Sequence, residues 1–419
     1  MTRMKESGID WIGQIPEEWE MSKIRYLVTT RSEKRITDSS VPYIGLENIE
    51  SQTGKFIKTG IQVDKSENIV VEIGDVLFGK LRPYLRKYWR ATFTSTASSE
   101  FLVFQSSELD MNFLYYAIQS DSFIEEVNTS TYGSKMPRAS WEYIKNMRIA
   151  FPTSLVEQQK IADFLDKKTA QLDKVKSLLE EQIQKLKDYR ASLIYKTVTK
   201  GLDKTVPMKD SGINWIGQVP EGWGVIKFKY LGDVKQGLTY SPSDIVDKDE
   251  GILVLRSGNI QNGILDFNNN VYVKTKVAES IVLRKNDILI TARNGSPVLI
   301  GKNAIIDTDI KATFGAFMMV FRANKSLFAK FAFYLMNVSF NFYRTFFTTS
   351  TVNQLTAAIF NGIEVPLPSV YEQKKITDFL DQKTVQIDKL IQIKNQQIKN
   401  INKQRQTLIY DYVTGKRRV

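Results

Sequence analysis

The sequence predicts an α+β fold, with mixed α/β content, in which one module is repeated in tandem. Three observations predict it. Lys5–Leu27 and Lys209–Leu231 match at 14 of 23 aligned positions. Short apolar runs separated by Gly, Asn and Ser follow both segments, as expected for strands joined by turns. Each copy then ends in a long helical pattern. A period of roughly 210 residues is too long for a solenoid, and 419 residues suffice for two or three domains.

Each module begins with an aromatic motif, Trp-Ile-Gly-Gln followed by Ile or Val and Pro, which starts at Trp11 and at Trp215. Its apolar side chains are costly to expose, so we expect a packing clasp, with docking of a partner as the alternative. The next elements recur in one order: strands at Asp75–Phe78 and Asp287–Thr291, strands at Phe101–Phe104 and Met318–Phe321, helices near Phe113–Ser120 and Phe331–Val338, and proline elements at Phe151-Pro152 and Pro366-Leu367-Pro368.

The first long helix is predicted over Glu157–Lys200, because no Gly or Pro interrupts it before Gly201. Apolar or long-stemmed residues recur in alternating steps of four and three, which is typical of a coiled-coil seam. At ~1.5 Å per residue this helix is a rod of roughly 65 Å, too long for one globular core, so it needs a partner helix. The predicted seam consists of Ile161, Leu165, Lys168, Leu172, Val175, Leu179, Gln182, Leu186, Tyr189 and Leu193.

The second module supplies that partner, because the helix opening at Glu157 recurs at Glu372 and continues to about Thr414. The second helix is more polar, and its register stays open. The register carried over from the first helix selects Lys394, Gln397 and Gln404, whereas Ile391 and Ile398 indicate a shifted stripe. The candidate spacer or partner-binding residues are Trp11, Trp215, Phe164, Leu165, Leu172, Leu179, Phe379, Leu380 and Ile387.

Composition excludes several kinds of chemistry. The chain has neither Cys nor His, which removes thiolate chemistry, the commonest general base and the usual zinc motifs. Gly74–Lys80 has the spacing of a phosphate-binding loop but lacks the following Ser or Thr, so we expect a strand there. Glu372-Gln373-Lys374 contains a nuclease-like Glu-x-Lys but lies on a predicted helix. From these motifs we expect no catalytic residue and no cofactor in this chain. No apolar stretch is long enough to span a membrane, so we expect a soluble, cytoplasmic protein.

The basic stretch Lys80–Arg90 is the strongest candidate for binding nucleic acid, which the net charge of +12 also permits. It interleaves cations with Tyr84, Tyr88 and Trp89, and cations can contact phosphates or guanine edges. The alternative is a strand edge whose rings lie in the core, and the sequence favours neither. The candidate DNA-binding residues in this stretch are Lys80, Arg82, Arg86 and Lys87.

Polar loops supply further candidates. The loop Gly133–Arg138 corresponds to Ser350–Gln354, and Arg293-Asn294-Gly295-Ser296 is the counterpart of the basic stretch. Arg can read guanine, while Asn and Gln can read adenine, although surface loops also contain such residues without a function. These loops and the turn near residue 256 add Lys135, Arg138, Arg256, Arg293, Asn294, Asn353 and Gln354 as DNA-binding candidates.

Three motifs occur twice and in the same order along the chain: Trp-Ile-Gly-x-Ile/Val-Pro-x-x-Trp, a Gly/Asn-Asp-aliphatic strand, and Pro…Glu-Gln-x-x-Ile-x-x-Phe-Leu-Asp. In this arrangement the whole chain resembles the specificity subunit of type I restriction–modification systems. The resemblance implies two target-recognition domains, at 1–155 and 204–369, and two conserved spacer helices, at 156–203 and 370–419. It also implies that the helices pack antiparallel and hold the domains apart with pseudo-twofold symmetry.

The resemblance further implies a non-catalytic chain that binds double-stranded DNA. Each domain would read half of a split, asymmetric site. Two methyltransferase subunits would bring S-adenosylmethionine and methylate adenine, and restriction–translocation subunits would join them. Two other hypotheses stay open from the residues: a nuclease or methyltransferase with an unrecognised active site, and a coiled-coil adaptor that does not touch DNA. The sequence identifies neither the bases read nor the spacer length.

Overall fold

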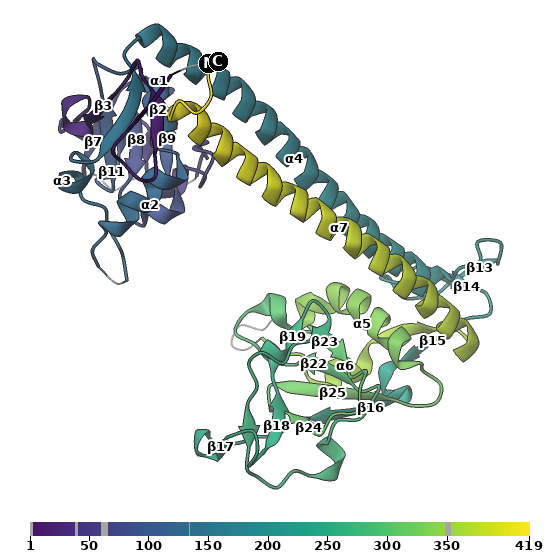
Figure 1. Ribbon diagram of the computed structural model, residues 1–419. Helices are drawn as coiled ribbons and strands as arrows, with labels where there is room; N and C mark the ends of the chain where they lie inside the picture. The colour runs from purple at the N-terminus through teal and green to yellow at the C-terminus, as the bar shows by residue number, and fades with distance from the viewer. Residues whose placement is uncertain (1–2, 38–40, 60–65, 134, 348–352) are drawn as a thin grey trace. The chain divides into compact units, whose positions relative to one another are not determined.

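The computed structural model describes residues 3–37, 41–59, 66–133, 135–347 and 353–419 (Figure 1). The chain packs into two compact units. Unit 1 contains Met1–Glu181 and Lys394–Val419, and unit 2 contains Gln182–Ile393. Both boundaries fall inside the long helices α4 (Leu155–Lys200) and α7 (Val370–Val413). We call the part of unit 1 before α4 domain 1, and the part of unit 2 between α4 and α7 domain 2.

Domain 1 contains two four-stranded sheets. The first has the order β5 (Lys34–Ile36), β7 (Glu67–Val71), β10 (Ser95–Ala97), β6 (Tyr43–Ile44), and the second has the order β4 (Thr29–Thr30), β11 (Phe101–Gln105), β8 (Val76–Gly79), β9 (Tyr88–Arg90). Two small pairs accompany them, β1 (Met4–Glu6) with β2 (Gln14–Pro16) and β3 (Trp19–Lys23) with β12 (Arg148–Pro152). The short helices are α1 (Met111–Ala117), α2 (Asp121–Thr129) and α3 (Trp141–Ile144).

Domain 2 repeats this plan. Its sheets have the orders β16 (Gly232–Gln236), β25 (Met318–Ala323), β22 (Ile288–Thr291), β23 (Asn303–Ile305) and β17 (Ile245–Val246), β21 (Tyr272–Val273), β18 (Ile252–Leu255), β24 (Ala312–Phe314). The small pairs are β13 (Met208–Asp210) with β14 (Gln218–Pro220), β15 (Gly224–Lys227) with β26 (Glu364–Leu367), and β19 (Ile260–Gln261) with β20 (Ile264–Leu265). Its helices are α5 (Ala329–Tyr343) and α6 (Ala357–Gly362).

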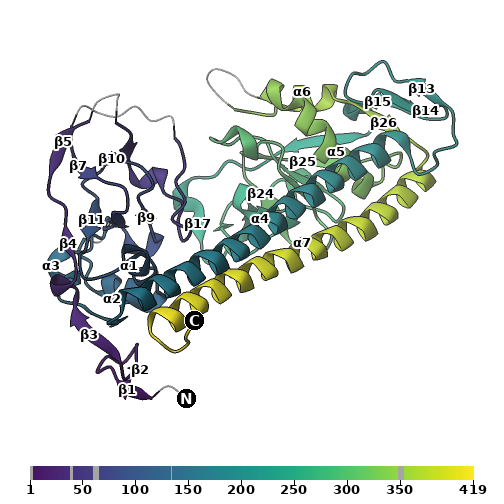
Figure 2. The same ribbon diagram turned by 90° about the horizontal axis from the view of Figure 1, so that it is seen from above.

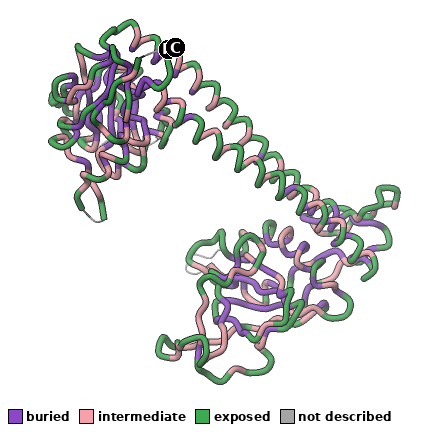
Figure 3. Tube along the Cα trace, in the orientation of Figure 1, coloured by how far each residue is buried: buried purple, intermediate pink, exposed green. Residues whose placement is uncertain are grey.

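In each domain the sheet that contains β8 or β22 is the central one. This sheet is buried on both faces, which explains why its strands are continuously apolar (Figure 3). On β8, Val76 and Phe78 face the core beside α1, α2 and the long helices, whereas Leu77 faces the other sheet, which contains β5, β7, β10 and β6. On β22, Ile288 and Leu289 divide in the same way between two cores. This alternation follows from the two-residue period of a strand. The strands predicted at Asp75–Phe78, Asp287–Thr291 and Phe101–Phe104 are confirmed within one residue.

The segments of α4 and α7 lie side by side and antiparallel in each unit (Figure 2). In unit 1, the rings of Phe164 and Tyr412 pack at a tilt with 4.5 Å between their centroids, and Asp173 lies 3.8 Å from Arg405. Residue numbers therefore increase along α4 in the direction in which they decrease along α7, so the two helices run antiparallel. In unit 2, Arg190 lies 3.3 Å from Asp388. Farther along α4 there, Ile194 and Val198 pack in one core with Ile376 and Leu380 of α7.

The seam of the helix pair differs from the predicted one. Leu165, Leu172, Leu179, Leu186 and Leu193 lie on the packed face as predicted, but Val175, Gln182 and Tyr189 are exposed. The intervening packed positions are one residue later, at Thr169, Lys176, Ile183 and Arg190. At Thr169, Lys176 and Arg190 the apolar criterion failed because the packed side chains are hydroxyl or cationic, with stems that cover apolar surface while their polar ends find partners. At Ile183 it failed for a different reason, because the regular spacing selected the neighbouring Gln182.

The second helix follows the same corrected pattern, displaced by 215 residues in number. Ile391 and Ile398 are half-buried, whereas Gln397 and Gln404 are exposed, so the shifted stripe is packed at these positions. Lys394 of the carried-over register is half-buried as well. Leu380 is fully buried, Ile387 is nearly so and Phe379 is half-buried. The repeat therefore extends to the packing of the helices and is not limited to their opening motifs.

The aromatic motif acts as a clasp at both ends of the long helices. Trp19 and Trp223 are buried, and their indole Nε1 atoms donate to Glu157 and Glu372 in the first turns of α4 and α7. The hydroxyl of Tyr410 donates to the carbonyl of Trp11 at 2.8 Å. The hydroxyl of Tyr195 donates to the carbonyl of Trp215 at 3.0 Å. Each motif thus joins the start of one long helix to the end of the other, which supports the packing hypothesis.

Candidate nucleic-acid interface

In domain 1 the fold brings the basic stretch and the polar loop together where β8 ends. The amide of Ala139 donates to the carbonyl of Lys80 at 2.8 Å, and the amide of Arg82 donates to the carbonyl of Pro137 at 2.7 Å. Leu81 forms an isolated antiparallel bridge with Arg138. Two candidates that lie over 50 residues apart in the sequence, Arg82 and Lys135, are also joined by a 3.2 Å hydrogen bond from Nη2 to the carbonyl.

Glu100 completes this arrangement, and sequence reasoning missed it. Its carbonyl accepts from the amide of Lys80 at 2.9 Å. Its carboxylate accepts from Arg138, with 3.2 Å between Nε and Oε2 and 2.9 Å between Nη2 and Oε1. These hydrogen bonds and the opposite charge raise the pKa of Arg138. Glu100 lies in the turn between β10 and β11, in no motif, and only the pairing of β8 with β11 brings it to Arg138.

The rest of the basic stretch divides between the core and internal contacts. Tyr88 and Trp89 are buried, whereas Tyr84 is 52% exposed. Arg86 pairs with Asp121 at 2.5 Å, and Nζ of Lys87 donates to the carbonyl of Ile49 at 2.5 Å. Burial lowers the pKa of Lys87. Of the two alternatives that the sequence left for this stretch, the one with rings in the core holds for Tyr88 and Trp89. Binding of nucleic acid by the stretch is not tested by these contacts. Contact of Arg86 and Lys87 with DNA stays a prediction.

Domain 2 builds the same framework at the end of β22. The amide of Leu355 donates to the carbonyl of Ala292 at 2.8 Å, and Arg293 forms a bridge with Gln354. The amides of Ala292 and Arg293 both donate to the carbonyl of Phe317, at 2.9 and 3.0 Å. Nη2 of Arg293 donates to Oε1 of Gln354 at 2.7 Å, and its guanidinium lies 5.7 Å from the centre of the Phe317 ring.

The remaining candidates of domain 2 lie on nearby turns. Oδ1 of Asn294 accepts from the amide of Ser296 at 3.0 Å, and Nδ2 of Asn353 donates to the carbonyl of Gly295 at 3.3 Å. Arg256 is exposed and donates to the carbonyl of Asn269 at 3.3 Å. Ser134 and residues 350–352 of the two predicted loops lie outside the described residues.

These hydrogen bonds define two equivalent sets of positions. We call Leu81, Glu100 and Arg138 cluster 1, and Arg293, Phe317 and Gln354 cluster 2. In both domains the residue directly after the central strand, Lys80 or Ala292, donates its amide hydrogen to the carbonyl of Glu100 or Phe317 in the turn before the neighbouring strand. The carbonyl of that same residue accepts from the amide of the loop residue that follows Arg138 or Gln354. The backbone is the same, but the side chains differ at all three positions. Arginine and glutamine are side chains that form paired hydrogen bonds with base edges in the major groove. Phe317 was missed from the sequence because its exposure, 60%, is visible only in the structure.

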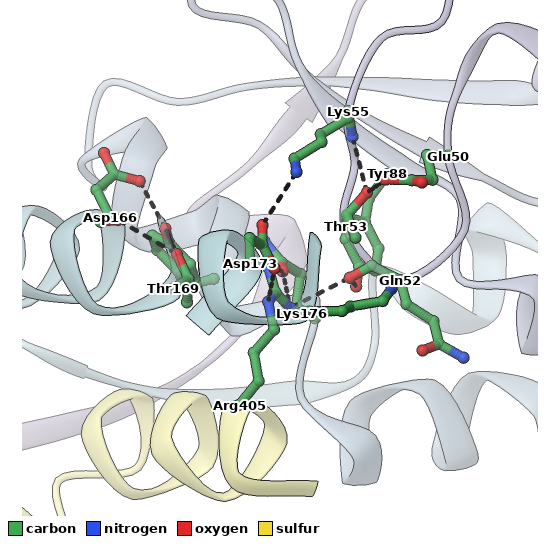
Figure 4. A network of polar contacts seen from close by, with 12 residues as sticks. Glu50, Gln52, Thr53, Lys55, Tyr88, Asp166, Thr169, Asp173, Lys176 and Arg405 are labelled. Carbon is green, nitrogen blue, oxygen red and sulfur yellow. Dashed lines mark hydrogen bonds and ion pairs between the residues drawn. The ribbon is translucent and has the colours of Figure 1, made fainter. Parts of the chain in front are cut away.

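Each domain is also fixed to the helix pair by a polar network. In unit 1, Asp173 of α4 lies 3.8 Å from Nε of Arg405 on α7 and 3.7 Å from Nζ of Lys55 in domain 1 (Figure 4). Nη1 of Arg405 donates to the carbonyl of Gln52 at 3.1 Å, and the hydroxyl of Tyr88 donates to the same carbonyl at 2.5 Å. The hairpin closed by the antiparallel bridge between Ile49 and Phe56 of domain 1 therefore contacts both long helices.

A second contact recurs in both units, about two helical turns before Asp173 in α4 and Asp388 in α7. In unit 1 the hydroxyl of Tyr116 donates to Asp166 at 2.6 Å, and Nη1 of Arg90 lies 3.1 Å from the same carboxylate. Burial and the hydrogen bond with Asp166 raise the pKa of Tyr116. In unit 2, Tyr334 donates to Asp381 at 2.7 Å. These contacts hold the domains on the helices by hydrogen bonds as well as apolar packing.

Among the residues that the structure describes there is no group of His, Cys, Asp and Glu that could hold a metal ion. Within the same residues, no helix has the length and apolar character needed to cross a membrane.

Comparison with known proteins identifies the family. The model of the type I restriction modification DNA specificity domain matches residues 16–187 and again residues 220–403. The chain belongs to this family. The double match agrees with the internal repeat, and it confirms the prediction of a non-catalytic specificity subunit with two tandem specificity domains.

Relatives of this specificity subunit are similar over different lengths. The specificity subunit of the type I restriction enzyme EcoKI from Escherichia coli K12 is 32% identical over 206 residues, which are 48% of this chain and 44% of that protein. The MjaVIII specificity subunit of Methanocaldococcus jannaschii is 24% identical over 97% of this chain and 94% of its own length. The match to the first relative thus spans less than half of that protein.

Solved structures support the fold. A chain from a study of complex assembly and conformational transition in the type I restriction–modification system superposes with a TM-score of 0.74, at 17% identity, over 95% of this chain and 98% of its own. The HsdS subunit from Thermoanaerobacter tengcongensis has a TM-score of 0.52, also at 17% identity, over 96% and 98%. The predicted α+β fold with two tandem domains is confirmed.

Proposed function

We propose that domain 1 and domain 2 each read one part of a bipartite, asymmetric DNA site. The observation that carries this proposal is the pair of clusters. A repeated backbone framework supports two readings with one geometry, because the same three positions stand at the end of the same strand in each domain. Different side chains at all three positions support two different half-sites, because the identity of the side chain decides which base edge it satisfies.

The candidate contacts in this proposal come from both domains. Lys80, Arg82, Lys135 and Arg138 serve domain 1, and Arg256, Arg293, Asn294, Asn353 and Gln354 serve domain 2. The lysines suit phosphates, which position a protein on the duplex, while Arg, Asn and Gln suit base edges. Binding should weaken with salt, because each neutralised phosphate releases counterions. Arg86 and Lys87 are weaker candidates, since their charged groups already have internal partners.

Partner subunits complete the proposed activity. Two methyltransferase subunits would supply S-adenosylmethionine and methylate adenine, restriction–translocation subunits would join them, and the complex would act in the cytoplasm. The relatives are specificity subunits of type I restriction enzymes, which supports this assembly. The specificity subunit itself needs no cofactor for this role.

The long helices act as spacers in the proposal. We retain 1–155 and 204–369 as target-recognition domains, and 156–203 and 370–419 as spacer helices. Packing supports the spacer role of Phe164, Leu165, Leu172, Leu179, Phe379, Leu380 and Ile387, all of which are buried or half-buried. Trp11 and Trp215 serve the clasps at the helix ends.

Methylome sequencing tests the proposal. The chain is expressed with its methyltransferase subunits in a host that lacks the system, and a matched host receives the methyltransferase subunits alone. We expect a bipartite methylated adenine motif only when this chain is present. Its absence would contradict the proposal and favour an adaptor that does not touch DNA. Methylation or cleavage of DNA by the purified chain alone would favour an unrecognised active site.

A further inference from the structure

We propose that Arg138 reads a guanine in the half-site of domain 1 and that Glu100 is the positioning residue that orients it. The inference rests on the proposed function and adds a base identity to it. The carboxylate of Glu100 occupies the Nε–Nη2 edge of the guanidinium, with three contacts of 2.9 to 3.3 Å. The Nη1–Nη2 edge keeps two donors that point away from the carboxylate, because the guanidinium is planar and its five N–H groups are fixed.

Guanine matches that free edge. In the major groove it presents O6 and N7, two acceptors side by side, and a bidentate arginine satisfies both. Adenine replaces the O6 acceptor with an amino donor, which would oppose a guanidinium donor. A guanidinium already fixed in its plane loses less conformational freedom on binding than a free arginine does. Glu100 therefore raises the selectivity for guanine without touching the base itself.

The pair is accessible, unlike a second pair of the same kind in domain 1. The side chains of Arg138 and Glu100 are 36% and 25% exposed. Arg31 and Asp75 form a similar two-point contact, at 3.0 and 3.2 Å, but the Asp75 side chain is only 8% exposed. Asp75 also accepts from the amide of Glu72 at 2.8 Å, as expected of a structural turn. The two pairs lie at opposite ends of β8, because Asp75 precedes this strand and Lys80 follows it.

The surroundings of Arg138 favour an anionic ligand. Lys80 and Arg82 adjoin it through the backbone contacts of cluster 1, and Lys135 lies three residues before it in the same loop. Lys135 is exposed, and Tyr132, which exchanges backbone hydrogen bonds with Arg138, is 64% exposed. In domain 2 the position equivalent to Arg138 carries Gln354, another residue suited to a base edge. The same loop position is thus assigned to base contact in both half-sites.

The test compares three variants in the complete methyltransferase complex. Arg138→Lys keeps the charge but removes the planar fork, Glu100→Gln keeps the shape but removes the carboxylate, and Arg31→Lys is the matched control at the structural pair. Methylated adenines are mapped by sequencing for each variant. Cluster 2 provides an internal reference, because the half-site of domain 2 should be read normally in all three variants.

We expect wild-type DNA motifs to contain a guanine in one half-site that Arg138→Lys no longer requires. Discrimination against the other bases at that position should fall about tenfold to a hundredfold. Glu100→Gln should relax the same position less, and Arg31→Lys should leave the motif unchanged. If Arg138→Lys abolishes methylation, binding of the purified complex to oligonucleotides with each base at that position replaces the readout. A lost preference for guanine supports the inference, and a retained one overturns it.

Failure of the inference can be told apart from failure of the proposed function. If the wild-type chain directs no bipartite methylation, the proposed function fails. If the wild-type motif is present but neither Arg138→Lys nor Glu100→Gln relaxes a guanine, only the inference fails. Relaxation of the half-site that a Gln354→Ala variant also relaxes would likewise overturn it, because both effects would then belong to domain 2.

Discussion

At the end of β8 a carboxylate holds an arginine, whereas at the equivalent place on β22 an amide and an aromatic ring accompany an arginine. Two backbone hydrogen bonds recur at the two places: the amide of Lys80 or Ala292 donates to the turn before the neighbouring strand, and the carbonyl of the same residue accepts from the loop. The comparison teaches that the framework of each cluster is carried by main-chain groups, which are present whatever the side chain. Side chains on such a framework can change without a change of fold, so the two copies of one module can acquire different ligands.

The two units differ in a second way, in how they enclose an Asp–Arg pair between the long helices. The pair Asp173 with Arg405 is equivalent to the pair Asp388 with Arg190, since the two aspartates differ by 215 in number and so do the two arginines. In unit 1 the side chains are 16% and 7% exposed, because a hairpin of domain 1 covers them. In unit 2 they are 58% and 37% exposed. We therefore expect the same Asp–Arg contact to contribute more to stability in unit 1, where the hairpin buries it, than in unit 2.

The largest effect is expected from breaking the buried pair. Arg405→Ala removes the buried cation that contacts Asp173 and the side chain of Gln119, and it leaves Asp173 with the largely exposed Lys55 as a charged partner. Loss of one partner of a buried pair costs about 3–5 kcal/mol. Urea unfolding followed by a probe in domain 1 measures it. Arg190→Ala is the matched control, and its exposed pair should cost about 1 kcal/mol or less. Equal losses in the two variants would contradict the role of the covering hairpin.

An intermediate effect is expected from alkaline pH. Burial raises the pKa of Tyr115 from 10.0 to about 12. The neutral form is favoured in the folded state, so its contribution is complete below pH 10 and is lost as the pH rises through 12. At ~1.36 kcal/mol per pKa unit, ionisation of Tyr115 lowers the free energy of unfolding by about 3 kcal/mol.

The equivalent residue of domain 2 is Phe333, so Tyr115→Phe makes domain 1 resemble its copy. The variant should lose about 1 kcal/mol at neutral pH, because the hydrogen bond to the carbonyl of Thr53 is removed. Between pH 10 and 12 its stability should fall less steeply than that of the wild type. Unfolding midpoints across this range measure the slope, and an unchanged slope would show that Tyr115 is not the titrating group.

The smallest effect is expected at cluster 2. Gln354→Ala removes the amide that accepts from Arg293, and with it a side chain suited to adenine. Discrimination at one base pair of the domain 2 half-site should fall about tenfold, or roughly 1.4 kcal/mol. Methylome sequencing of the complex measures this change, with the domain 1 half-site as the control. A change confined to the domain 1 half-site would show that the clusters are assigned to the wrong halves.

Local pattern was sufficient for much of the fold. The strand at Val76–Gly79 and both long helices follow from runs whose period is set by the backbone. The helix seam was not predictable in the same way, because Thr169 and Arg190 occupy packed positions that an apolar criterion passes over. Their suitability depends on partners such as Tyr116 and Asp388, which lie far away in the sequence.

The candidate site was predicted in part. Arg138, Arg293 and Gln354 were found because the repeat aligned two polar loops and residue chemistry singled them out. Glu100 and Phe317 were missed, since each lies in an ordinary turn and acquires its role only when β11 or β25 pairs with the central strand. Lys87 was singled out by its charge, and the structure shows its Nζ donating to a main-chain carbonyl, so its contact with DNA stays a prediction.

The composition of unit 1 has a consequence for the order of folding. Ile409, Tyr412 and Val413 of α7 belong to the same core as Trp19 and Phe113 of domain 1. Those three residues are synthesised after the whole of unit 2, which is a continuous stretch of chain. On the ribosome, the domain that emerges first must therefore wait with an unfinished core, while the domain that emerges second has all its partners before synthesis reaches residue 394.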